Sequence, residues 1–197
     1  MERKQILVDV DGVLLWWAHG FMQFMKNAYS LDLDIENHVF DIHKWIGWEK
    51  EVTRGIIDEF NERSWEFGCL PPLLDAQYYV KRLTDEGYRF VAITSCSSNP
   101  QTIALRRANL FHHFGDVFDA VHCVPLFESK EPQLGDYRPT FWIEDTPKNA
   151  EAGLKFGHHP LLIDRVASQG YSHPNVRRVQ NWEEIYQIIT QAKKDDS

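Results

Sequence analysis

The sequence predicts an α/β fold, with helices on both faces of a doubly wound parallel sheet and a small helical segment inserted after the first strand. Short apolar runs that do not alternate with polar residues end abruptly at polar positions, as in strands buried on both faces. Helical stretches separate these runs, which predicts right-handed strand–helix–strand crossovers. Between residues 16 and 70 the chain is aromatic and helical in character, without a convincing buried strand, and this predicts the insert.

The expected strands are the apolar runs themselves. They cover residues 6–8, 90–93, 140–143 and 161–163, with a weaker run at residues 120–124. The first run ends at Asp9, the second at Thr94 and the third at the pair Glu144-Asp145. Because ligands bind at the carboxyl ends of the strands in an open parallel sheet, we expect these polar groups to converge.

Helices are expected wherever apolar residues recur at helical spacing or a capping residue precedes a proline. In the insert they cover residues 21–29 and 51–67, and outside it residues 75–86. Asn99-Pro100 and Thr146-Pro147 each place a proline behind an N-cap residue, the second opening a helix through residue 156. A capping pair, Asn181 and Glu184, opens a last helix through residue 193.

The domain organisation follows from this reading. Residues 1–15 and 71–197 form the expected α/β core, and residues 16–70 form the helical insert. The pair Pro71-Pro72 marks the return of the chain to the core.

Composition limits the classes of function. The chain has 197 residues with 43% hydrophobic and 25% charged residues, as in ordinary globular proteins. Its formal charge of −8 argues against broad nucleic-acid binding, which needs clustered basic residues. Three cysteines without pairing spacing, and an N-terminal apolar run too short for a signal segment or a membrane span, indicate a cytoplasmic protein.

The strand-end residues form a chemically coherent set. A carboxylate such as Asp9 can attack phosphorus and form an aspartyl-phosphate, and Asp11, two residues on, can protonate the leaving oxygen and later activate water. A hydroxyl and a lysine can hold the phosphoryl oxygens. Further acidic oxygens suit Mg²⁺, a hard cation that prefers oxygen ligands.

Three segments resemble motifs of the haloacid dehalogenase-like superfamily. Residues 8–14, Val-Asp-Val-Asp-Gly-Val-Leu, resemble its first motif, and residues 93–95, Ile-Thr-Ser, its second. Residues 142–153 resemble the acidic fourth motif with the helix behind it, and Lys130 is the candidate for the third-motif lysine, with Lys148 as its competitor. The resemblance covers residues 6 to about 164 and implies a phosphoric monoester hydrolase with a Rossmann-type core.

The resemblance also implies roles for individual residues. Asp9 would be the nucleophile and Asp11 the general acid/base, and Asp9, the Asp11 backbone carbonyl and Asp145 would hold the metal. Glu144 is a further candidate metal ligand. The expected phosphate-binding residues, Asp9 among them, are Gly12, Thr94, Ser95, Cys96 and Lys130. The Cys96 thiol itself could be a nucleophile, but no histidine or helix pattern around it demands this.

The helical insert is where substrate specificity is expected. Together with residues 70–73 and 94–95 it is similar to cytosolic and mitochondrial 5'(3')-deoxyribonucleotidases, which implies a small nucleoside monophosphate substrate and a monomer or homodimer. Five tryptophans near or within the insert either form its core or supply a stacking wall for a planar group: Trp16, Trp17, Trp45, Trp48 and Trp65. A polynucleotide 3'-phosphatase, a sugar phosphatase or phosphomutase on the same core, and a non-catalytic phosphate-binding module remain alternatives.

Overall fold

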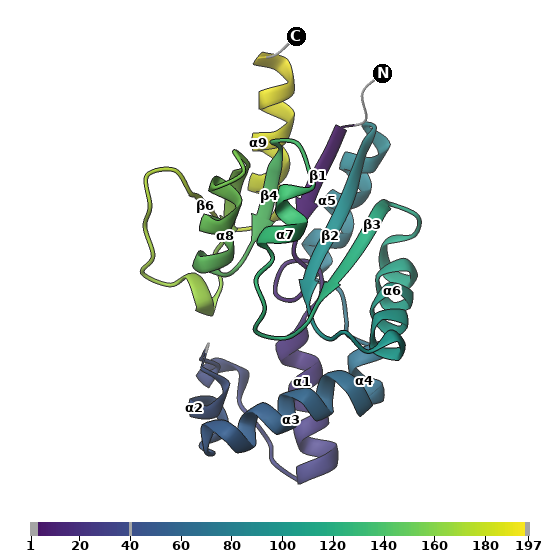
Figure 1. Ribbon diagram of the computed structural model, residues 1–197, viewed down its shortest axis with the longest axis vertical. Coiled ribbons are helices and arrows are strands. Elements are labelled where there is room, and N and C mark those ends of the chain that lie inside the picture. Colours follow the sequence, from purple (N-terminus) through teal and green to yellow (C-terminus); the bar gives the residue numbers. More distant parts are fainter. Residues whose placement is uncertain (1–3, 40, 196–197) are drawn as a thin grey trace.

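The computed structural model describes residues 4–39 and 41–195, with the side chains of residues 193–195 excepted. Within them, six parallel strands form one sheet in the order β3-β2-β1-β4-β5-β6 (Figure 1). The strands are β1 (Lys4–Val8), β2 (Tyr88–Ser95), β3 (Phe118–Val124), β4 (Phe141–Glu144), β5 (His159–Ile163) and β6 (Arg177–Val179). The expected α/β class with an all-parallel sheet is confirmed.

Helices cover both faces of this sheet. On one face, α5 (Leu74–Asp85), α6 (Pro100–Phe114) and α9 (Trp182–Asp195) contribute to a cluster that includes Ile6, Val8 and Phe90. On the other face, α7 (Glu131–Gly135) and α8 (Pro147–Leu154) pack with Leu7 and Val91. Neighbouring strand residues therefore point into opposite apolar layers, which explains why the strands read as continuous apolar runs.

Four helices between β1 and α5 lie beyond the carboxyl ends of the strands (Figure 1). They are α1 (Trp17–Tyr29), α2 (Ile42–Ile46), α3 (Lys50–Arg63) and α4 (Trp65–Gly68), with a short 3-10 helix η1 (Ile35–Asn37). The two chain connections to the core run side by side, since Trp16 N–H donates to the Pro71 carbonyl and Leu73 N–H to the Leu14 carbonyl, both at 2.9 Å. This pairing brings the two ends of residues 16–70 together, and the division into core and insert stays a prediction. The outer limits 1 and 197 of the expected core lie outside the described residues.

Some expected elements differ from the observed ones. The helix expected over residues 51–67 is two helices, because Ser64 leaves the helical conformation and accepts from the Phe67 N–H as the N-cap of α4. Asn99 caps α6 through its side chain, as expected, whereas the Thr146 hydroxyl donates to Asp145 instead of capping α8. Neither the short helix α7, which begins directly after Lys130, nor the short strand β6 was among the expected elements.

Within the residues that the structure describes, no helix is both long and apolar enough to span a membrane.

The five tryptophans of residues 16–70 differ in burial, and none of them is fully buried. Trp17, Trp45 and Trp48 pack against the core cluster, whereas Trp16 and Trp65 are exposed. Trp17, Trp45 and Trp48 thus contribute to the core of the insert, whereas Trp16 and Trp65 do not.

Candidate active site

The site lies where the strand order reverses. The chain proceeds from β1 to β2 and β3 on one side, and β4 pairs with β1 on the other, which leaves a crevice outside their carboxyl ends. Asp9 follows β1, its N–H donates to the Ile143 carbonyl at 2.9 Å, and Glu144 ends β4. Parallel pairing of two strands thus places two acidic strand ends side by side.

Lys130 joins these two carboxylates. Its Nζ lies 2.6 Å from Asp9 Oδ1 and 2.7 Å from Glu144 Oε1, and all three side chains are buried. Its position at the N-cap of α7 turns it inward, whereas the competing Lys148 is exposed. The structure therefore brings Lys130, and not Lys148, to the candidate nucleophile.

Glu144 is held by donors on both of its oxygens. Oε1 accepts from Lys130 and from Asn149 Nδ2 at 2.8 Å, and Oε2 accepts from the backbone N–H groups of Asp145 at 2.6 Å and Thr146 at 2.8 Å. A carboxylate has about four lone-pair positions, so these bonds occupy its acceptor capacity. This arrangement does not favour Glu144 as a direct metal ligand, and it fixes Lys130 instead.

The acidic cluster fits a divalent cation. One oxygen each from Asp9, Glu144 and Asp145 lies within 4.8 Å of the other two. Glycine at position 12 makes room for Asp145, because a Cβ there would lie 2.3 Å from Asp145 Oδ2, and the residue has φ of +80°. Hard carboxylate oxygens around one point are the donor set that Mg²⁺ prefers.

Acidic side chains outnumber their ion-pair partners in the site. Among the described residues, the ion-pair partners of the four carboxylates of Asp9, Asp11, Glu144 and Asp145 are Lys130 and Arg106 alone. Burial raises the pKa of Asp9 to about 7 despite Lys130, and burial with Glu144 and Asp9 nearby raises the pKa of Asp145 well above its usual value. Burial alone would lower the pKa of Lys130, but its two acidic partners raise it. A bound cation would relieve this excess of negative charge.

Asp11, the candidate general acid/base, is held on one side only. Arg106 Nη2 donates to Asp11 Oδ2 at 2.8 Å, and Asp11 Oδ1 has no hydrogen-bond partner among the described residues. Burial raises the pKa of Asp11, and the Arg106 guanidinium opposes the rise. Asp11 therefore lines the cavity while one of its two oxygens is fixed by Arg106.

The candidate phosphate-binding residues at the ends of β1 and β2 differ in their contacts. The Thr94 hydroxyl is buried and has no hydrogen-bond partner within the described part of the chain, and Thr94 is not among the residues that line the cavity. Ser95 lines the cavity. The expectation for the Cys96 backbone is corrected, because its N–H already donates to the Val124 carbonyl at 2.9 Å. Gly12 N–H is likewise committed to the Leu15 carbonyl at 2.9 Å, so Gly12 contributes space and not a donor.

A cavity of about 330 Å³ opens over Asp9 and Lys130 between the core and the insert. The insert side and the chain leading to it contribute Trp16, Trp17, Ala18, His38 and Ile42, and the core side contributes Arg165, Val166 and Ala167, which follow β5. The rest of the lining includes Asp11, Gly12, Leu73, Ser95, Asp145, Thr146 and Asn149. Its volume lies at the lower end of ordinary small-molecule sites.

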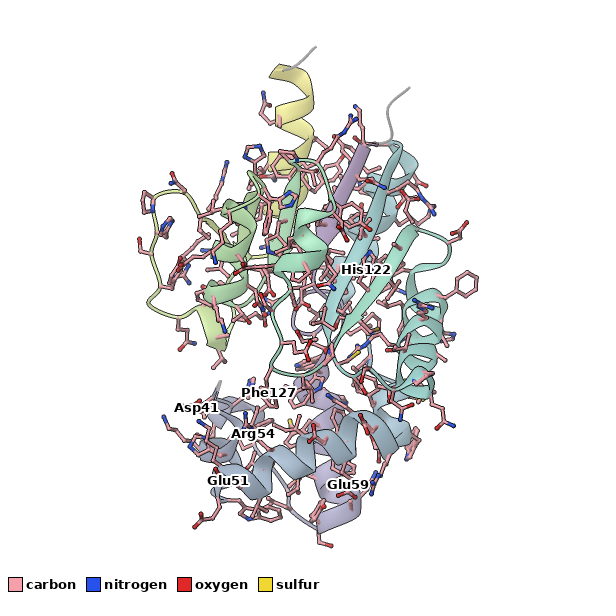
Figure 2. All side chains as sticks on the ribbon, in the orientation of Figure 1. Asp41, Glu51, Arg54, Glu59, His122 and Phe127 are labelled. Atoms are coloured by element: carbon pink, nitrogen blue, oxygen red, sulfur yellow. The ribbon has the colours of Figure 1, made fainter. Side chains whose placement is uncertain are left out.

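Core and insert also contact each other through Arg54 and Phe127. Arg54 of α3 lies over the ring of Phe127, with its guanidinium carbon 4.6 Å from the ring centroid (Figure 2). Phe127 adopts a positive φ of 68° in the loop that leads to Lys130. The loop carrying the site lysine thus touches the insert directly.

Three site residues were missed from the sequence. Arg165 lines the cavity and donates to the Gly12 carbonyl at 2.9 Å, Arg106 holds Asp11, and Asn149 holds Glu144. The sequence did not single out Arg106, because the burial of Thr102, Arg106 and Asn109 on one face of α6 is known only from the structure. No local pattern identified Arg165, which reaches the site only through the return of the chain after β5.

Similarity to known proteins agrees with this geometry. The family described as "5' nucleotidase, deoxy (Pyrimidine), cytosolic type C protein" matches residues 3–195. An uncharacterized 32.4 kDa protein from the Gp30-rIII intergenic region of Enterobacteria phage T4 is 24% identical over 203 residues, which cover 98% of this chain and 72% of that protein.

Solved structures share the fold. A predicted phosphatase from Clostridium acetobutylicum has a TM-score of 0.67 at 15% identity, covering 96% of this chain and 99% of that one. D,D-heptose 1,7-bisphosphate phosphatase from B. bronchiseptica, complexed with magnesium and phosphate, has a TM-score of 0.58 at 15% identity, with coverage of 96% and 99%. A haloacid dehalogenase-like hydrolase from Streptococcus pneumoniae has a TM-score of 0.63 at 14% identity, with coverage of 94% and 98%.

The family match and the shared phosphatase fold together define a phosphoric monoester hydrolase. Within that class, the chain belongs to the family of cytosolic type C 5' (deoxy)nucleotidases, which matches it over nearly its whole length.

Proposed function

We propose that this protein hydrolyses a nucleoside monophosphate, with a deoxyribonucleotide as the favoured substrate, in a magnesium-dependent reaction through an aspartyl-phosphate on Asp9. The observation that carries the proposal is the position of Asp9, which follows β1 beneath the cavity with Lys130 on one oxygen and Asp145 close by. Membership of a nucleotidase family supports the substrate class.

In the first step an Asp9 carboxylate oxygen attacks phosphorus, and the bond from phosphorus to the ester oxygen breaks. Asp11 donates its proton to the departing oxygen, so that the product leaves as a neutral alcohol. The Lys130 ammonium and the uncommitted Thr94 hydroxyl are the groups available to hold the phosphoryl oxygens.

In the second step water attacks the phosphorus of the aspartyl-phosphate. The water proton passes to Asp11, the bond between phosphorus and the Asp9 oxygen breaks, and inorganic phosphate is released. The cycle leaves Asp9 ionised and Asp11 protonated, which are the states that the first step requires.

Asp9, Asp145 and the Asp11 backbone carbonyl would hold the Mg²⁺, with Glu144 fixing Lys130 beside them. The bound cation would supply positive charge that offsets the repulsion between the Asp9 carboxylate and the phosphate dianion. The excess of buried carboxylates over direct cationic partners supports this need.

Residues 16–70 would act as a cap that selects the substrate. The cavity lies between the insert and the loop after β5, so a base bound there would contact both. Trp16 and Trp17, which line it, are candidates for stacking on a planar group.

The test is phosphate release from a panel of esters with and without Mg²⁺. The panel holds 5'- and 3'-deoxynucleotides, ribonucleotides, sugar phosphates and a 3'-phosphorylated oligonucleotide. We expect Mg²⁺-dependent release, fastest from a deoxynucleoside monophosphate and abolished in Asp9→Asn. Preference for a sugar phosphate or the oligonucleotide would contradict the substrate, and an active Asp9→Asn variant would contradict the mechanism.

A further inference from the structure

Arg106 is a buried cation that the proposed reaction does not use directly. Its side chain has no exposed surface, and it does not line the cavity. Its guanidinium carbon lies 4.3 Å from the ring centroid of Phe67, which belongs to α4 of the insert. Arg106 therefore lies between the insert and the core, below the candidate active site.

The hydrogen bonding of Arg106 is incomplete. Nη2 donates to Asp11 Oδ2 at 2.8 Å, while Nε and Nη1 are buried without a partner among the described residues. A buried donor left unsatisfied destabilises the folded state, because it has lost its hydrogen bonds to water without replacing them. An apolar side chain could pack between α6 and α4 without leaving donors unsatisfied. The bond to Asp11 is what a guanidinium provides here and an apolar side chain does not.

That bond also distinguishes the two oxygens of Asp11. Oδ2 is committed to Arg106, and Oδ1 has no partner within the described part of the chain. A carboxyl group that transfers a proton must present one oxygen to the reacting ester and keep a fixed orientation. A charge-assisted bond to a buried, immobile guanidinium provides that orientation.

We propose that Arg106 is a positioning residue for Asp11: by holding Oδ2 it sets the orientation of the carboxyl group that gives a proton to the leaving oxygen and receives the proton of the attacking water. This inference rests on the proposed function. Because Arg106 packs on Phe67, the same side chain ties the orientation of Asp11 to the placement of α4.

The first test compares two leaving groups. A deoxynucleoside monophosphate expels an alkoxide that needs a proton, whereas 4-nitrophenyl phosphate expels a stable phenolate that does not. In Arg106→Met, which keeps an apolar stem against Phe67, we expect kcat on the nucleotide to fall about 100-fold with KM changed by less than about threefold. The rate of nitrophenolate formation in a single turnover should fall much less. Equal losses on both esters would overturn the proposal.

The second test is a double-mutant cycle with Asp11→Asn, measured on 4-nitrophenyl phosphate with saturating enzyme and followed through phosphate release. If Arg106 acts through Asp11, Arg106→Met should cost little once Asp11 is replaced. A purely structural role would reduce the rate by the same factor in both backgrounds, and that result would overturn the proposal.

Arg107→Met is the matched control. Arg107 is the next residue of α6, lies exposed and donates only to the Val121 carbonyl at 3.1 Å, outside the site. We expect its kinetics to match those of the unmodified protein. If Arg106→Met does not fold, Arg106→Lys carries the test, because it keeps the charge and should retain more nucleotide turnover than Arg106→Gln.

A crystal structure of Arg106→Met separates this inference from the proposed function. We expect the Asp11 carboxylate to leave its present orientation, and an unchanged Asp11 would overturn the proposal whatever the enzyme hydrolyses. Absence of turnover by the unmodified protein on every ester would instead count against the proposed function.

Discussion

Glu144 and Asp11 are both carboxylates near Asp9, but their surroundings differ. Glu144 is fully buried and accepts four hydrogen bonds, from Lys130, Asn149 and two backbone N–H groups. Asp11 accepts one from Arg106 and keeps one oxygen without a partner among the described residues. The fully satisfied Glu144 is fixed and fixes Lys130, whereas the orientation of the partly satisfied Asp11 depends on the single bond to Arg106.

We expect the largest effect from removing Lys130, which bonds to the fully satisfied Glu144. Lys130→Met leaves Asp9 and Glu144 buried without their cation, so we expect the free energy of unfolding to fall by about 3–5 kcal/mol and phosphatase activity to be lost. Urea denaturation and phosphate release measure the two effects.

Lys155→Met is the control for Lys130→Met. Its ammonium forms an ion pair with Glu131, the first residue of α7, at 2.6 Å on the surface. An exposed ion pair contributes about 0–1 kcal/mol to the free energy of unfolding. A loss of stability as small in Lys130→Met as in Lys155→Met would show that the buried cluster is not the rigid element described above.

The next effect concerns Asp145, the proposed metal ligand. A Cβ in Gly12→Ala would lie 2.3 Å from Asp145 Oδ2 and must displace that carboxylate. We expect Mg²⁺ affinity to fall by about 10- to 100-fold, comparable to the loss of a group that orients a metal ligand. Isothermal titration calorimetry measures it.

Gly87→Ala separates contact from backbone strain. Gly87 has φ of +90°, similar to Gly12, but a Cβ there has nothing within 4 Å. This variant should lose some stability, of order 1–3 kcal/mol, and keep its Mg²⁺ affinity. Equal affinity losses in both variants would place the cause in strain and not in Asp145.

A smaller effect should follow from pH. Burial raises the pKa of Asp9 to about 7, so the metal-free protein protonates this carboxyl as the pH falls through that range. Protons then compete with the cation, and Mg²⁺ affinity should fall by about tenfold between pH 8 and pH 6. The same shift lowers the stability of the metal-free protein as the pH rises through 7, because the unfolded chain carries the ionised group more easily. Affinity independent of pH would contradict the role of Asp9 as ligand.

The smallest effect tests whether the four donors to Glu144 are individually needed. Asn149→Ala removes one of them and leaves Lys130 and the backbone donors, so we expect a loss of about 1 kcal/mol and a modest fall in kcat. The exposed Asn37, which bonds to Asp34, provides the control, and Asn37→Ala should change stability by less than about 0.5 kcal/mol. A loss of activity as large as that of Lys130→Met would show that the four donors do not share the task.

The strands other than β6, and the convergence of Asp9 and Glu144, were predictable, because buried parallel strands read as apolar runs and their ends meet at one edge. Lys130 was one of two candidate lysines, with Lys148, because the short helix α7 that follows Lys130 carries little local sequence signal. Arg106 was not predicted, because an arginine in a helix is usually solvated and only tertiary packing shows that its helix face points inward. The boundary at Ser64 was missed for a similar reason, since the apolar pattern continues through it.

The central claim is that Asp9 becomes phosphorylated during turnover. The most direct measurement is acid quenching of the enzyme with Mg²⁺ and a deoxynucleoside monophosphate, followed by mass spectrometry of the peptide that contains Asp9. We predict a phosphoryl group on Asp9 that appears and decays at rates consistent with turnover and is absent from Asp9→Asn. Sustained turnover with no phosphorylated peptide at any quench time, or with the phosphoryl group on another residue, would contradict the claim.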